Sequence, residues 1–85
     1  MTERKEPDET DKVLCFDFTG LKCPLPVLKA RRALSDALPG AVIEVVADDP
    51  AAPLDFAHFC ETAGHKLLSV KEQGPQFHFR IQKQG

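Results

Sequence analysis

Cys23 stands in the run TGLKCPLP (residues 19–26), which follows a strand-like apolar stretch and precedes an amphipathic, helix-like one. Pro24 is expected to be the first helical residue, because proline has no N–H to lose there and its fixed φ suits a helix. Cys23 would then be the N-cap, where free backbone N–H groups and the helix dipole favour a thiolate. The thiolate is the nucleophilic form of cysteine, so the sequence predicts a reactive Cys23 whose pKa falls from about 8.5 towards about 7.

The neighbours of Cys23 are expected to shape this site. Lys22 adjoins the sulfur and adds positive charge, while Pro24 and Pro26 stiffen the start of the helix on either side of Leu25. No Ser/His/Asp constellation surrounds this corner, and a thiolate nucleophile needs no general base.

A cluster of basic residues continues along the predicted helix. Lys29, Arg31 and Arg32 follow Lys22 on a chain whose net charge is −2. This cluster is either a solvated helix face or a surface that docks a partner protein, because a local positive field steers acidic partners.

Two other thiols compete with Cys23. Cys15 lies in the middle of a predicted strand without a source of positive potential, so we expect an inert packing residue, either under the helices or on the far face of the sheet. Cys60 lies in a predicted helix beside Phe59 and is expected to be core or semi-exposed rather than catalytic. Scattered histidines and the absence of a Cys-x-x-Cys pair argue against a metal site.

The composition limits the classes of protein that this chain can belong to. Eighty-five residues with 42% hydrophobic content fit one small domain. The 11 basic and 13 acidic residues argue against a module that binds nucleic acid through phosphate contacts. Three cysteines give no disulfide framework, and no run reaches transmembrane length, so we expect a cytoplasmic protein with reduced thiols.

The pattern along the chain predicts its architecture. Residues 1–12 have no aliphatic side chain after Met1 and are expected to form a disordered leader before a single domain over 13–85. Hydrophobic periodicity predicts strand 13–18, helix 24–38, strand 41–47, helix 50–63, strand 66–71 and strand 77–83. This β-α-β-α-β-β order predicts an α/β two-layer sandwich with two helices on one face of a four-stranded mixed sheet, its first two strands parallel.

Two blocks of this sequence resemble the signature of the TusA/SirA family of small sulfur-carrier proteins. The first is FDFTGLKCPLPV (residues 16–27), and the second runs from ADDPA (47–51) through Asp55, Phe56 and Phe59-Cys60 to Gly64-His65. The likeness extends from about residue 14 to residue 83. It implies the same sandwich fold and a persulfide carried on Cys23 as the catalytic residue, without a cofactor or a metal.

The resemblance also implies partners. Members of the family accept sulfane sulfur from cysteine desulfurases or rhodanese-like donors and pass it to tRNA 2-thiouridine synthesis, molybdenum cofactor assembly or sulfur oxidation. We therefore expect a partner-dependent sulfurtransferase that is monomeric, with a protein donor and a protein acceptor, and with no membrane or direct nucleic-acid partner. By similarity, Arg31 lies on the helix face that meets the donor, and Leu25 replaces the Glu of some tRNA-pathway members.

Two other functions stay open at this level. The protein could instead be a regulatory or interaction module that binds a partner through the segment at Cys23 and the basic helix, without chemistry at Cys23. RNA binding is suggested only by the likeness of this layout to the C-terminal domain of translation initiation factor three, and fold likeness alone does not carry function.

Overall fold

Four strands and two helices follow one another in residues 13–84, the part of the chain that the computed structural model describes. They are β1 (Val13–Asp17), α1 (Leu25–Asp36), β2 (Val42–Ala47), α2 (Ala52–Ala63), β3 (Lys66–Gln73) and β4 (Gln76–Gln82). The predicted β-α-β-α-β-β order is confirmed, whereas the leader predicted over residues 1–12 lies outside the described residues.

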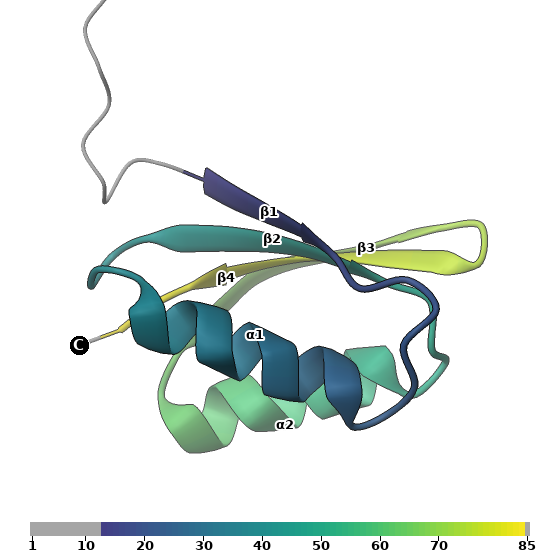
Figure 1. The fold of residues 1–85 in the computed structure, drawn as a ribbon, viewed down its shortest axis with the longest axis horizontal. Coiled ribbons are helices and arrows are strands. Elements are labelled where there is room, and N and C mark those ends of the chain that lie inside the picture. The colour runs from purple at the N-terminus through teal and green to yellow at the C-terminus, as the bar shows by residue number, and fades with distance from the viewer. Residues whose placement is uncertain (1–12, 85) are drawn as a thin grey trace, which may run out of the picture.

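The strands form one mixed sheet in the order β1-β2-β4-β3. β1 pairs in parallel with β2, and β4 runs antiparallel to both of its neighbours. Figure 1 shows α1 and α2 on the same side of this sheet, as the sequence predicts. Because β1 and β2 are parallel, their carboxyl ends meet at one edge, and both helices are entered from that edge.

The core lies between the sheet and the two helices. Phe56 of α2 stacks on Phe79 of β4 with ring centroids 4.4 Å apart, and both side chains are fully buried. Leu34 of α1 and Ile43 of β2 are also fully buried. Alternation along the strands sends Glu44 and its cross-strand neighbours to the helix-free face, where they remain accessible to water.

Both helices begin later than the sequence predicts. The N–H of Leu25 bonds to the Lys22 carbonyl at 2.8 Å, and the N–H of Ala52 bonds to the Asp49 carbonyl at 2.9 Å. Each bond closes a turn before its helix, so Pro24 and Pro50 lie in turns rather than at first helical positions. A proline after a strand suits either place.

The end of α2 agrees with the sequence. Gly64 takes φ +83°, a left-handed conformation that ends helices readily, and its N–H bonds to the Cys60 carbonyl at 2.9 Å. Neither of the two helices described in residues 13–84 is long and apolar enough to cross a membrane.

Phe56→Ala should test the importance of the interlayer core. The variant leaves a cavity against Phe79, so the free energy of unfolding should fall by about 3–5 kcal/mol, a large part of what a small domain has. Urea denaturation followed by circular dichroism measures this loss. Leu54→Ala is the matched control on the same helix: Leu54 is 77% exposed, and its loss should change stability by less than about 0.5 kcal/mol.

Candidate functional site

Cys23 lies in the turn between β1 and α1, and its side chain is exposed. The residue preceding α1 is Pro24, so Cys23 is not the N-cap that the sequence predicts. It is a central residue of the turn closed by the bond between Lys22 and Leu25, and its peptide bond to Pro24 is cis. The structure therefore presents the thiol on a turn rather than on the helix terminus.

Two neighbouring carboxylates at the end of β2 hold this turn in place. Asp49 accepts a hydrogen bond from the Cys23 N–H at 2.7 Å through one oxygen and from the Ala51 N–H at 2.9 Å through the other. Asp48 accepts a hydrogen bond from the Gly20 N–H at 2.9 Å. These bonds from Ala51 and Cys23, aided by the charge of Lys22, hold the pKa of Asp49 below its ordinary value.

A third carboxylate fixes the exit from β1. Asp17 accepts hydrogen bonds from the Thr19 hydroxyl at 2.6 Å and from the Thr19 N–H at 3.0 Å, and these lower the pKa of Asp17. Hydrogen bonds to Asp17, Asp48 and Asp49 therefore hold the chain between β1 and Cys23 in place.

The electrostatic environment of the thiol is the opposite of the predicted one. Hydrogen bonding with the Asp55 carboxylate raises the pKa of Cys23, and desolvation and the negative charges of Asp55 and Asp49 raise it further. The predicted fall in the pKa of Cys23 is therefore wrong. The negative charges of the two carboxylates favour the protonated thiol, and this effect outweighs the opposite effect of the adjacent Lys22.

The start of α1 cannot reverse this effect, because few of its N–H groups are free. The N–H of Leu25 bonds to the Lys22 carbonyl, the N–H of Leu28 bonds to the Pro24 carbonyl at 3.1 Å, and Pro26 has none. The sequence predicts free N–H groups at the start of α1, and the preceding turn occupies the one of Leu25.

A groove of about 270 Å³ opens beside the thiol, between the start of α1 and the side of α2. Its lining residues are Cys23, Pro24, Val27, Asp55, His58, Phe59 and Thr62. Asp55, His58 and Thr62 are spaced three and four residues apart on α2, so they share one helix face. In the sequence, Asp55 stands out only as part of the family likeness and His58 only as one of the scattered histidines, although this spacing could have indicated a polar stripe.

The other two cysteines lie away from this groove. Cys60 is 3% exposed, and burial raises its pKa to about 11, so the predicted core placement is confirmed. Cys15 is exposed on the helix-free face of the sheet, with its Sγ 3.7 Å from Glu44 Oε1. The sequence predicts Cys15 either under the helices or on the far face of the sheet, and it lies on the far face. It is nevertheless not the packing residue that the sequence predicts, because no helix covers that face.

Within residues 13–84, no group of three or more His, Cys, Asp or Glu side chains is placed to hold a metal ion. The three cysteines are all free thiols.

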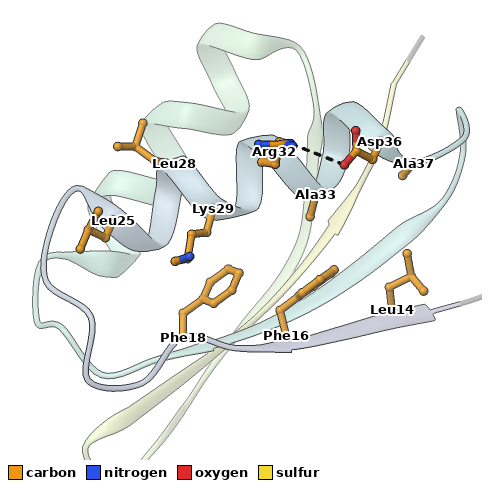
Figure 2. Close-up of a pocket in the computed structure, with 10 residues that line it drawn as sticks. All are labelled: Leu14, Phe16, Phe18, Leu25, Leu28, Lys29, Arg32, Ala33, Asp36 and Ala37. Atoms are coloured by element: carbon orange, nitrogen blue, oxygen red, sulfur yellow. Dashed lines mark ion pairs between the residues drawn. The ribbon is translucent and has the colours of Figure 1, made fainter.

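The basic residues of α1 are divided by the fold. Lys29 and Arg32 border a larger groove of about 570 Å³ between α1 and β1, and Arg32 Nε lies 3.7 Å from Asp36 Oδ2. Figure 2 shows the apolar side of this groove, where Phe16 and Phe18 point from the β1 segment towards the helix. Arg31 is exposed on α1 and lines neither groove.

Asp49→Ala should release the turn that carries Cys23. Amide hydrogen exchange, measured by NMR, should become at least about tenfold faster at Cys23 and Ala51, because both N–H groups lose a charged acceptor. In the native protein this protection should persist as the pH falls through about 4, because the pKa of Asp49 lies below the ordinary value.

Asp36→Ala is the control, since it removes a carboxylate at the far end of α1. Unchanged exchange at Cys23 in Asp49→Ala would show that Asp49 does not hold the turn.

Comparison with known proteins places this chain in a family. The profile of the family described as sulfurtransferase TusA matches residues 16–83. The chain is 43% identical over 68 residues to the sulfur carrier protein TusA of Allochromatium vinosum, covering 80% of this chain and 90% of that protein. It is 48% identical over 67 residues to a putative sulfur carrier protein of Neisseria meningitidis serogroup A, covering 79% and 90% respectively. The chain belongs to the TusA sulfurtransferase family.

Proposed function

We propose that this protein is a sulfur carrier that accepts sulfane sulfur on Cys23 as a persulfide and gives it to an acceptor protein. The observation that carries the proposal is the exposed Cys23 thiol on a turn anchored by Asp49, beside an open groove. The position of Cys23 within the matched region of the family supports it, as do the names of the two relatives.

The proposed transfer needs no cofactor. The Cys23 sulfur attacks the outer sulfur of a donor persulfide, a new S–S bond forms, and the S–S bond of the donor breaks. The donor leaves as a thiolate, and the proton that Cys23 gives up balances the proton that the donor thiol regains. An acceptor thiol later repeats the same exchange on the Cys23 persulfide, so sulfur moves without net oxidation.

The environment of Cys23 favours a dependence on partners. Because the pKa of the thiol is raised, the isolated protein has little of the reactive thiolate at neutral pH. Docking of a donor changes the solvation and the charges around the sulfur, so the exchange proceeds mainly inside a complex. This supports a partner-dependent sulfurtransferase over a freely reactive thiol.

The proposed docking surface is the exposed side of α1 with the neighbouring apolar groove. Leu25 and Leu28 are 45% and 49% exposed there, beside Lys29 and Arg32, and Arg31 adds a further positive charge. Apolar anchors with a basic rim suit a partner with an acidic, partly apolar surface.

The proposed donor is a cysteine desulfurase or a rhodanese-like protein. The proposed acceptor is a protein of tRNA thiolation, molybdenum cofactor assembly or sulfur oxidation. We propose that the carrier acts as a cytoplasmic monomer, without binding nucleic acid or membrane directly.

Cys23→Ser should abolish sulfur uptake. After incubation with a cysteine desulfurase and cysteine, intact mass should show one added sulfur on the native protein and none on Cys23→Ser, because Cys60 is buried and Cys15 lies on the helix-free face. Cys15→Ser is the matched control and should load fully. Sulfur on Cys23→Ser would contradict the proposal, and a native protein that never loads would favour the regulatory module.

Arg31→Glu should slow loading by the partner enzyme severalfold, because steering by surface charge acts on the association rate and weakens with salt. Reaction of Cys23 with iodoacetamide, which is small and neutral, should stay nearly unchanged. Lys71→Glu makes the same change of charge on the helix-free face, where Lys71 lines a separate hollow, and should have no effect. Equal loading by both variants would show that α1 is only a solvated face.

A further inference from the structure

The groove beside Cys23 contains a carboxylate that the transfer reaction described above does not use. Asp55 comes from the first turn of α2, whereas Cys23 comes from the turn before α1, and the two line the same groove. Asp55 thus lies at the positive end of the helix dipole of α2. No ion pair within residues 13–84 neutralises Asp55.

We propose that Asp55 is a positioning residue for sulfur release: its carboxylate holds the protonated thiol of the unloaded carrier in the groove and disfavours the anionic persulfide of the loaded one. This inference rests on the proposed function, since it concerns the same sulfur.

The unloaded state fits this arrangement. An ionised carboxylate only accepts hydrogen bonds, and a thiol offers one S–H to donate. Hydrogen bonding with Asp55 is the largest cause that keeps the Cys23 thiol protonated. Asp55 thus favours the form of the carrier that remains after the sulfur has gone.

The loaded state is disfavoured by the same charge. A persulfide is a stronger acid than its parent thiol, so the loaded sulfur is anionic more often and has no proton to donate. Two carboxylates, Asp55 from α2 and Asp49 from the end of β2, act on the Cys23 sulfur by charge. Lys22, the residue before Cys23, carries the positive charge that opposes them, and His58 lines the same groove.

The exchange with an acceptor follows from these preferences. The acceptor thiolate attacks the outer sulfur of Cys23–S–SH, the S–S bond to Cys23 breaks, and the Cys23 sulfur leaves as a thiolate. That thiolate takes up a proton, and the resulting S–H is held by Asp55. The carboxylate therefore shifts the exchange towards release, which suits a carrier more than a store.

The test compares Asp55→Asn with the native full-length chain. Alkylation of Cys23 by iodoacetamide, followed on its own peptide across the pH range, should show a midpoint about one unit lower and a rate at pH 7 about tenfold higher. In a buffer of glutathione and glutathione persulfide, the variant should hold severalfold more sulfur on Cys23 at equilibrium. Asn has the shape of Asp, so loss of packing does not account for a shifted pH profile.

Two further variants separate the carboxylate from the helix. Asp55→Glu restores a carboxylate and should return both readouts towards the native values. Glu61→Gln removes an exposed negative charge from the same helix, outside the groove, and should change neither readout.

Different results would overturn different statements. Normal loading of the native protein with unchanged alkylation and unchanged sulfur partition in Asp55→Asn would overturn this inference alone. A shifted alkylation profile without a shift in sulfur partition would overturn the role in release. Absence of sulfur on native Cys23 would overturn the proposed function itself.

Discussion

The carboxylate of Asp49 joins two chain segments on which the whole site depends. Cys23 and Asp49 are 26 residues apart in sequence, and the hydrogen bond between them is 2.7 Å long. The same carboxylate binds the Ala51 N–H at the entrance to α2. This contact is possible because β1 and β2 are parallel and in register, so Asp17 pairs with Val46 and both strands release their chains at one edge of the sheet. The Asp49 side chain therefore fixes the turn that carries Cys23 relative to the starts of both helices.

Anchoring by carboxylates has an electrostatic consequence. Acceptors that hold backbone N–H groups also place negative charge near the sulfur, and Asp49 contributes to the raised pKa of Cys23 together with Asp55. A site built in this way gains rigidity and loses intrinsic thiolate. In the proposed function, the exposed thiol of the unloaded carrier then depends on its partners for reactivity.

The sequence predicted the elements of the fold well because each element has a strong local signal. The β-branched run of β2 and the alternation of Phe77, Phe79 and Ile81 against polar residues in β4 give strands, and Gly64 ends α2 where the pattern predicts. The starts of both helices are predicted too early, because a proline fits both a turn and a first helical position. The hydrogen bonds that decide between the two belong to the preceding turns.

The environment of the thiol could not be predicted from the same local signals. The pKa of Cys23 depends on Asp55, which reaches the sulfur only because α2 packs beside α1. Likewise, the exposure of Cys15 depends on which face of an edge strand the helices cover, and the strand pattern leaves both faces open. Residue type and spacing identified Cys23 as a candidate, whereas the tertiary contacts with Asp55 and Asp49 raise its pKa.

The two sides of α1 border different grooves. The buried stripe of α1 consists of Pro26, Ala30 and Leu34. The groove beside Cys23 lies on the α2 side of this stripe, and the larger groove that Lys29 and Arg32 border lies on the β1 side. The charges that act on the sulfur come from the end of β2 and from α2, not from the basic residues of α1. If the proposed docking surface is used, substitutions at Lys29 or Arg32 change partner recognition while leaving the field at the sulfur intact.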